Sequence, residues 1–188
     1  GTVIKTVGPI ANHANGVSWI LTSAHMARQG VRITIDAPDP APVAAQPVTA
    51  RIVAVDKAAD LALIIFEKGP LPYVCPVAPV GSVPGRLLSV GYDDLQWPAK
   101  QRSAHLLGVP TAFTYINADI TGQQYTARSG DEANFVLTQE LPWHGRSGGA
   151  LIDVDRGALV GVVAGYRGTS PRAWAEVKQG CSGVYTSH

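Results

Sequence analysis

The chain has 188 residues, of which 46% are apolar and 15% charged, and its formal net charge is +1. This length lies between one large domain and two small ones, and the apolar content is sufficient for a buried core. No Lys/Arg cluster is longer than a dipeptide, so the composition argues against nucleic acid or an anionic membrane as a partner. No apolar run approaches the roughly 18 residues of a transmembrane helix.

Glycine and proline, at 20 and 14 residues, divide the chain into short segments rich in β-branched side chains. This pattern is typical of an all-β protein. In chain order, the segments predict strands at residues 2–7, 17–23, 31–36, 48–56 and 61–67, and then at 86–92, 103–109, 114–119, 135–139, 150–154, 159–166 and 184–187.

A proline-rich linker, residues 68–85, separates these strands into two groups, and it has little capacity for strand or helix. Helix is expected only as one turn after Ala24 and over residues 172–179. We therefore expect two six-stranded antiparallel β-barrels with very little helix, the first over residues 1–78 and the second over residues 79–188.

Two polar residues stand at strand ends of the first half. His25 follows the buried strand 17–23; such a residue, taken alone, is more often a structural histidine at the edge of a core. Asp60 precedes the apolar run 61–66, where a buried carboxylate needs a hydrogen-bond donor, and an imidazole N–H is a suitable one. The alternative for Asp60 is a turn aspartate, which is our interpretation of Asp56.

Ser147 lies in the second half, in the sequence Gly-Arg-Ser-Gly-Gly. A serine hydroxyl becomes nucleophilic only beside a base, and it needs N–H donors for the oxyanion, which Gly145 and Ser147 could supply. Alone, this serine reads as a turn residue. The order His25, Asp60, Ser147 in an all-β chain, however, matches the chymotrypsin arrangement of the catalytic triad.

Longer motifs around these residues resemble the trypsin-like serine proteases of the chymotrypsin double-barrel fold, and among them the bacterial HtrA-type protease domains. The motifs are WILTSAHM, RIVAVDKAADLALIIF, GRSGGALIDVDRGALVGVVAG and SGVYTS. The resemblance implies a serine endopeptidase in which His25 is the general base, Asp60 its orienting acid and Ser147 the nucleophile. The amides of Gly145 and Ser147 would then form the oxyanion hole.

The resemblance also implies where the specificity pocket lies. Leu141 would stand at its base, Ala164, Gly165 and Tyr166 on one wall and Gly183 near the other. The base carries no acidic residue, so we expect no Arg/Lys preference but a small or medium apolar side chain before the scissile bond. Val163 stands where glutamate-specific relatives carry histidine, which argues against that specificity.

Three departures from the family pattern leave alternatives open. Arg146 replaces the usual Asp or Asn before the serine, Met26 replaces the cysteine of animal relatives, and no PDZ module follows the second barrel. If Arg146 disturbs the oxyanion loop, the chain would be a pseudoprotease that serves as a binding or scaffolding module. A third reading is an HtrA-type protease that stays inactive until a partner or oligomer contact orders its loops.

The remaining signals concern redox state, metals and partners. Cys75 and Cys181 could form a disulfide or remain two buried thiols. The other histidines (His13, His105, His144 and His188) lack metal-ligand spacing, and we expect neither metal nor cofactor. The expected partners are protein or peptide substrates, without nucleic acid or membrane insertion. The resemblance favours an extracytoplasmic or periplasmic location, any leader having been removed.

Overall fold

The computed structural model describes residues 1–9, 15–27, 32–33, 48–67, 70–71, 74–79, 85–92, 99–108, 116–118, 124–126, 135–138, 146–166 and 184–187. The first half contains β1 (Thr2–Val7), β2 (Val17–Ser23), the 3-10 helix η1 (Ala24–Met26), β3 (Arg32–Ile33), β4 (Val48–Thr49), β5 (Arg51–Asp56) and β6 (Leu61–Phe66). The second half contains β7 (Leu87–Gly91), β8 (Lys100–Ala104), β9 (Leu106–Gly108), β10 (Ile116–Ala118), β11 (Gln124–Thr126), β12 (Phe135–Thr138), β13 (Ala150–Asp153), β14 (Ala158–Tyr166) and β15 (Val184–Ser187).

Every segment predicted as a strand contains one, and the fold is all-β as expected. The turn predicted after Ala24 is the 3-10 helix η1. Two strand segments were not predicted: β11, whose three residues Gln-Tyr-Thr are too few to show a period, and the beginning of β8, where Lys-Gln-Arg has no apolar residue. The helix predicted over residues 172–179 lies outside the described residues.

The first sheet has the strand order β1-β2-β6-β5 and is antiparallel throughout. Its two central strands, β2 and β6, are the most deeply buried, with Ile20, Ile64 and Phe66 packed together as a core. This sheet has four strands, and β3 and β4 pair separately, so the single six-stranded first barrel expected above is not seen in the described residues.

The second sheet has the order β8-β7-β13-β14-β15-β12-β9. Its two edge strands, β8 and β9, are separated in the chain only by His105, so the sheet curls until its two edges are neighbours. If β8 and β9 are taken as one bent segment, this sheet contains the six segments expected of the second barrel. Leu87, Ala104 and Leu151 form its buried apolar cluster.

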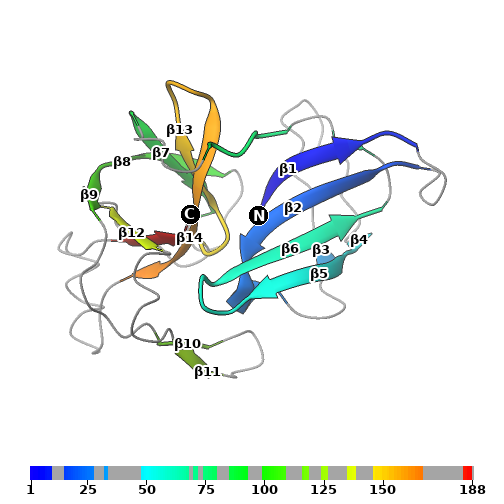
Figure 1. Ribbon diagram of the computed structural model, residues 1–188, viewed down its shortest axis with the longest axis horizontal. Coiled ribbons are helices and arrows are strands. Elements are labelled where there is room, and N and C mark those ends of the chain that lie inside the picture. Colours follow the sequence, from blue (N-terminus) through cyan, green and yellow to red (C-terminus); the bar gives the residue numbers. More distant parts are fainter. Residues whose placement is uncertain are drawn as a thin grey trace.

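The two groups of strands lie side by side, with the N-terminus between them (Figure 1). The linker segment 74–79 contacts both groups. The Cys75 N–H donates to the Val3 carbonyl of β1 at 2.8 Å, and the Ala78 N–H donates to the Leu159 carbonyl of β14 at 2.8 Å. β14 also contacts β2 directly, so the central strands of the two sheets face each other.

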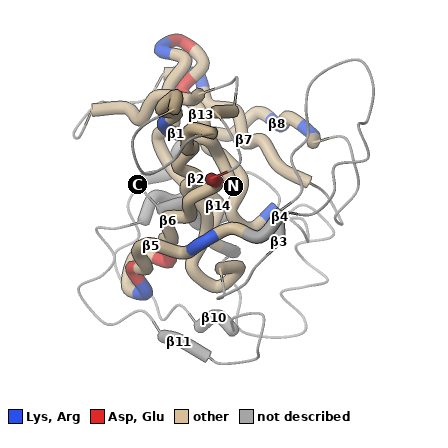
Figure 2. The backbone as a smooth tube through the Cα atoms, turned by 90° about the vertical axis from the view of Figure 1, so that its right-hand side faces the viewer, with Lys and Arg blue, Asp and Glu red and all other residues tan. Residues whose placement is uncertain are grey.

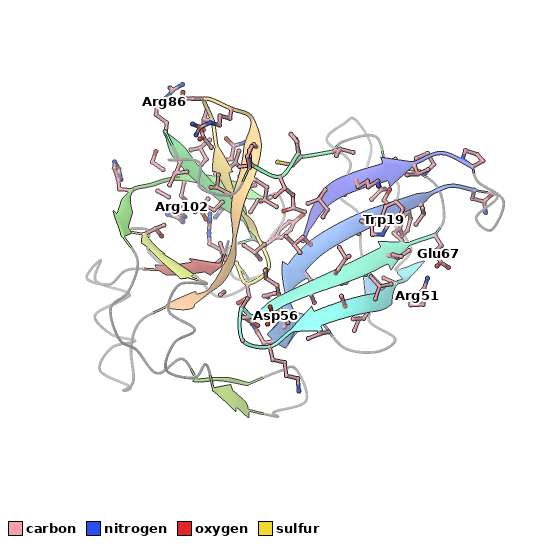
Figure 3. The ribbon with its side chains drawn as sticks, viewed as in Figure 1. Trp19, Arg51, Asp56, Glu67, Arg86 and Arg102 are labelled. Carbon is pink, nitrogen blue, oxygen red and sulfur yellow. The ribbon has the colours of Figure 1, made fainter. Side chains whose placement is uncertain are left out.

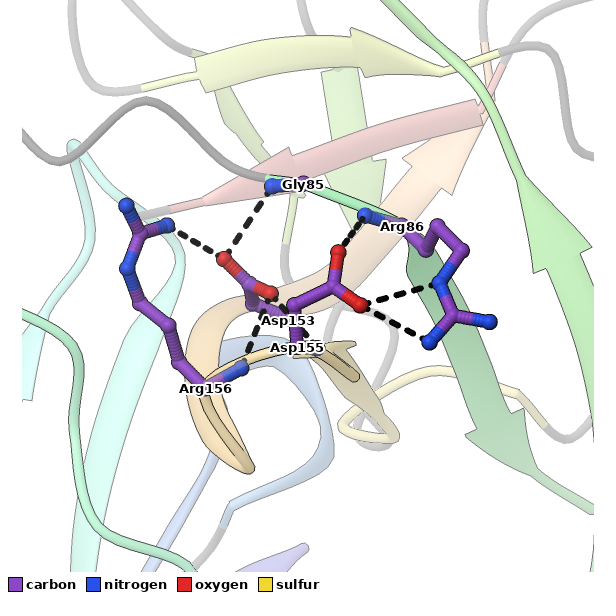
Figure 4. A network of polar contacts seen from close by, with 5 residues as sticks. All are labelled: Gly85, Arg86, Asp153, Asp155 and Arg156. Carbon is purple, nitrogen blue, oxygen red and sulfur yellow. Dashed lines mark hydrogen bonds and ion pairs between the residues drawn. The ribbon is translucent and has the colours of Figure 1, made fainter.

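Charged residues gather at turns rather than within the central strands (Figure 2). The turn between β13 and β14 holds a polar network in which Asp153 accepts the Gly85 N–H at 3.1 Å and pairs with Arg156 (Figure 4). Asp155 accepts two hydrogen bonds from the Arg86 guanidinium, at 2.8 and 2.9 Å. These bonds tie the end of the linker to the hairpin. No helix in the described part of the chain is long and apolar enough to cross a membrane.

Candidate active site

His25 and Asp60 are brought together by the pairing of β2 with β6. These strands run antiparallel, with Ser23 opposite Leu61. A residue that follows β2 and a residue that precedes β6 therefore lie at the same end of the sheet. His25 follows β2 within η1, and Asp60 is the last residue before β6, so the strand register alone accounts for their proximity.

Two hydrogen bonds join His25 to Asp60, and a third joins the neighbouring Ala24 to Asp60. His25 Nδ1 lies 2.8 Å from Asp60 Oδ2, the His25 N–H donates to Asp60 Oδ1 at 2.9 Å, and the Ala24 N–H donates to the Asp60 carbonyl at 2.9 Å. His25 is 6% exposed and Asp60 is fully buried. A carboxylate at Nδ1 favours the tautomer with the proton on Nδ1, which leaves Nε2 as a proton acceptor.

The backbone of Asp60 is held in an unusual conformation. Its φ is 53°, in the left-handed region that residues other than glycine rarely adopt. Such a conformation costs on the order of 1–3 kcal/mol and persists only where the surroundings impose it. Here the bonds to Ala24 and His25 impose it, and they aim the carboxylate at the imidazole.

Ser147 lies in a four-residue turn that begins at Arg146. The Gly149 N–H donates to the Arg146 carbonyl at 2.8 Å and closes the turn. Gly148, the third residue, has φ +80°, which glycine adopts without strain. The Gly148 N–H donates to the Val163 carbonyl at 2.8 Å, and the Val163 N–H donates to the Gly149 carbonyl at 2.9 Å, so the turn is anchored to β14.

The serine turn packs against the end of β2. A Cβ atom on Gly148 would overlap the Thr22 hydroxyl and lie 3.3 Å from the Ser23 amide nitrogen. Only glycine therefore permits this approach. It brings the serine turn against Thr22 and Ser23, which precede His25 by three and two residues. Between residues that the structure describes, no hydrogen bond joins the Ser147 hydroxyl to the His25 imidazole.

The predicted specificity residues are only partly described. Ala164 is buried on β14, and Gly165 and Tyr166 end that strand. β14 pairs with β15 as far as Tyr166, but its pairing with β13 ends at Val162. Leu141, Gly145 and Gly183 lie outside the described residues, as do His13, His144 and His188.

A cavity of about 370 Å³ lies beside the serine turn. It is lined by the beginning of β1, by Cys75, by the end of β7, and by Ser147 and Gly149. None of the described lining residues lies on β14, along which the sequence predicts the specificity pocket. Its lining is mostly apolar, with valines from β1, the linker and β7.

Cys75 carries a free thiol, and burial raises its pKa. The free thiol of Cys75 agrees with the thiol alternative and argues against a Cys75–Cys181 disulfide; Cys181 itself lies outside the described residues. Within the part of the chain that the structure describes, no group of three or more His, Cys, Asp and Glu side chains is arranged to hold a metal ion.

Asp56 behaves as the turn residue that the sequence suggested. It ends β5 (Figure 3), and its Oδ1 accepts the N–H groups of Ala58 and Ala59 at 2.9 and 3.1 Å. Asp56 and Asp60 thus lie in one turn but have different partners.

Sequence reasoning missed the environment of Arg146. The sequence left open whether this residue disturbs the oxyanion loop. In the structure its side chain is buried, and its guanidinium donates to Ser89 Oγ at 2.7 Å. Ser89 lies in the middle of β7, far from Arg146 in the sequence. No motif or spacing links the two residues, so only the fold could reveal this contact.

Two antiparallel β-sheets side by side, with a buried His–Asp pair at the end of one and a serine turn leading into the other, define the chymotrypsin-like fold. The family model for the trypsin-like peptidase domain matches residues 2–162, and the chain belongs to this family. The match confirms the resemblance drawn from the motifs, and it supports a peptidase function that acts on proteins. No curated protein matches the chain.

Solved structures share the fold at low sequence identity. The active form of the Rv3671c protease from M. tuberculosis is 20% identical, with a TM-score of 0.56 over 99% of this chain and 75% of that one. The MamO protease domain from Magnetospirillum magneticum is 16% identical, with a TM-score of 0.55 over 98% and 90%. The serine endoprotease from Yersinia pestis is 19% identical, with a TM-score of 0.52 over 99% and 53%.

Proposed function

We propose that the chain is a serine endopeptidase that hydrolyses peptide bonds of protein substrates through an acyl-enzyme intermediate. One observation carries the proposal: His25 is held by Asp60 at the end of β2, and the glycine after Ser147 packs against that same strand end. The base and its orienting acid come from residues 1–78 and the nucleophile from residues 79–188, which we propose as the two domains.

The proposed reaction follows from the geometry of the His–Asp pair. Ser147 Oγ attacks the carbonyl carbon of the scissile bond while His25 Nε2 takes the hydroxyl proton. The carbonyl electron pair moves to the oxygen, where the amides of Gly145 and Ser147 donate hydrogen bonds. His25 then gives its proton to the leaving nitrogen, and water repeats the sequence to release the acyl group. Asp60 stays ionised and keeps the proton on Nδ1.

Substrate binding is proposed along the end of β14. By the family resemblance, an extended substrate segment would lie beside Ala164 and Tyr166 and add to this strand through main-chain hydrogen bonds. Leu141, expected at the base of the pocket, agrees with a small or medium apolar residue before the scissile bond. Profiling on a peptide library tests this preference, and dominant cleavage after Arg or Lys would contradict it.

The nucleophile assignment is tested by incubating the purified chain with a fluorophosphonate and locating the adduct by mass. We expect one adduct on Ser147 that is absent from the Ser147→Ala and His25→Ala variants. Circular dichroism of each variant controls for folding. An adduct elsewhere, or an unchanged adduct in His25→Ala, would contradict the proposed triad.

The second candidate is a pseudoprotease that binds proteins without cleaving them. The observation that favours it is the lack of a hydrogen bond between Ser147 and His25 among the described residues. Catalytic hydrogen bonds are often long before substrate binds, so the same observation fits an enzyme without substrate. The fluorophosphonate decides between the two, because a folded pseudoprotease would not be labelled.

A further inference from the structure

Arg146 stands directly before the proposed nucleophile and is the largest fully buried side chain described, with 1% exposure. Arginine is almost never fully buried unless its charge and donors are paired. Its Nη1 donates to Ser89 Oγ at 2.7 Å, and its Nη2 donates to the Lys100 carbonyl at 3.0 Å. The two acceptors come from β7 and β8, so one guanidinium holds both strands of a hairpin.

The main chain of Arg146 forms the first residue of the serine turn. Its carbonyl accepts the Gly149 N–H that closes the turn. The stem of the side chain runs along Gly91, where an added Cβ would be 3.4 Å from Arg146 Cγ. Arg146 therefore connects the turn that carries Ser147 to the β7–β8 hairpin, through both its main chain and its side chain.

The turn is held on its other side by different groups. The Gly148 N–H and the Gly149 carbonyl bond to Val163 on β14. β14 and β7 are the two neighbours of β13, into which the turn leads. The position of Ser147 is thus set between two anchors, and the guanidinium of Arg146 is the side-chain anchor on the β7 side.

We infer that Arg146 is a positioning residue for Ser147. By donating hydrogen bonds to Ser89 and to the Lys100 carbonyl, it holds the serine turn in the geometry required for attack. This inference rests on the proposed function and is the opposite of the alternative in which Arg146 disturbs the oxyanion loop. A buried guanidinium is costly to desolvate, and an apolar side chain of similar size in its place is often neutral or stabilising. A purely structural role is therefore a poor reason for an arginine here.

The planar geometry of the guanidinium suits Arg146 to this role. It presents N–H groups in fixed directions, so two acceptors on two strands can be bound at once. A lysine ammonium is a point charge on a flexible stem and cannot reproduce that geometry. We therefore expect Arg146→Lys to resemble Arg146→Met rather than the wild-type protein.

The experiment compares fluorophosphonate labelling of the full chain in four forms: wild type, Arg146→Met, Ser89→Ala and Arg86→Met. Inactivation rates over a range of probe concentrations separate the maximal rate from the concentration at half-maximal rate. Arg86 is the matched control. Its guanidinium also donates hydrogen bonds from one strand end to another, from just before β7 to Asp155 after β13, but this pair is exposed. Thermal melting is measured for each form.

For Arg146→Met we expect the maximal labelling rate to fall by about 100-fold, because displacement of a reacting atom by about 1 Å is sufficient for such a loss. The half-maximal concentration and the melting temperature should stay close to wild type. For Ser89→Ala, which removes one of the two acceptors among the described residues, the expected loss is about tenfold. Arg86→Met should be labelled as fast as wild type.

Guanidinium ion added to Arg146→Ala should restore part of the labelling rate, which a general loss of stability would not allow. Wild-type rates in both Arg146→Met and Ser89→Ala would overturn the inference while leaving the proposed function intact. If Arg146→Met does not fold, Ser89→Ala decides, and an unchanged rate in that variant overturns the inference. Absence of labelling in folded wild-type protein would refute the proposed function, and this inference with it.

Discussion

Asp60 in the first sheet and Asp153 in the second are built with similar bonds but in different settings. Each is buried at a strand end and accepts a backbone N–H together with a basic side chain. The partner of Asp153 is Arg156, a guanidinium that has no acceptor atom, whereas the partner of Asp60 is His25, an imidazole whose second ring nitrogen can accept a proton from a nucleophile. The bonding pattern alone therefore does not mark a functional carboxylate; the partner and the location do.

The turns that contain these residues differ in their backbone as well. In the turn between β13 and β14 the positive φ, 61°, falls on Gly157, where it costs little. In the turn between β5 and β6 it falls on Asp60, at 53°. Strained non-glycine residues concentrate at functional sites because the surrounding contacts must impose them. The contrast supports a functional role for Asp60 and a structural one for Asp153.

The largest expected effect comes from Asp60→Asn, which keeps the shape of the side chain and removes its charge. An amide can donate to Nδ1 and stabilise the wrong imidazole tautomer, so we expect peptide hydrolysis to slow by about 10⁴-fold. Asp153→Asn is the matched control and should leave the rate per folded molecule unchanged. Equal losses in the two variants, measured as kcat/KM on one substrate, would remove the distinction between the two carboxylates.

The next effect comes from Gly148→Ala, compared with Gly157→Ala. Both glycines have positive φ, but a Cβ at Gly148 would overlap Thr22, whereas at Gly157 it meets nothing within 4 Å. We expect Gly148→Ala to displace Ser147 and to slow fluorophosphonate labelling by about 100-fold. Gly157→Ala should cost about 1 kcal/mol of folding free energy without changing the labelling rate. Labelling at the wild-type rate in Gly148→Ala would contradict the close approach to β2.

Acid should destabilise the β13–β14 hairpin network. The Gly85 N–H, followed by Arg156, lowers the pKa of Asp153, and the Arg86 guanidinium lowers the pKa of Asp155. Carboxyls with a lowered pKa in the folded protein contribute stability that is complete above the ordinary value of about 4 and is lost as the pH falls through the folded value. The urea midpoint should therefore fall as the pH is lowered below about 4. This acid-dependent decrease should be smaller in Asp155→Asn, and a decrease equal to that of wild type would contradict the network's contribution.

The smallest effect is expected at Ser23, the last residue of β2. Its hydroxyl is buried and has no hydrogen-bond partner among the described residues. A buried hydroxyl without a partner is destabilising, so Ser23→Ala should raise the free energy of unfolding by about 1 kcal/mol. Urea denaturation measures this change. Ser18→Ala is the control that should destabilise, because the Ser18 hydroxyl accepts the Leu71 N–H at 2.9 Å.

The local pattern of apolar and polar residues was sufficient to predict most strands, because their alternation can be seen in consecutive residues of the sequence. Strands β1, β2 and β15 have the predicted bounds. The pattern did not predict that β8 pairs with β7 while β9 pairs with β12. The chain passes from one edge of the sheet to the other at His105, and this depends on the curvature of the sheet rather than on local sequence. The same holds for β11, which is a strand because of its partner β10.

The sequence by itself determined the all-β class, the family and the candidate residues His25, Asp60 and Ser147, because each lies in a motif of neighbouring residues. Only the tertiary structure showed how Asp60 is aimed at His25 and what surrounds Arg146. Both depend on strand register and on contacts between residues distant in the chain, such as Arg146 with Ser89. Periodicity within a segment carries no information about such contacts, and the packing of the two sheets supplies it.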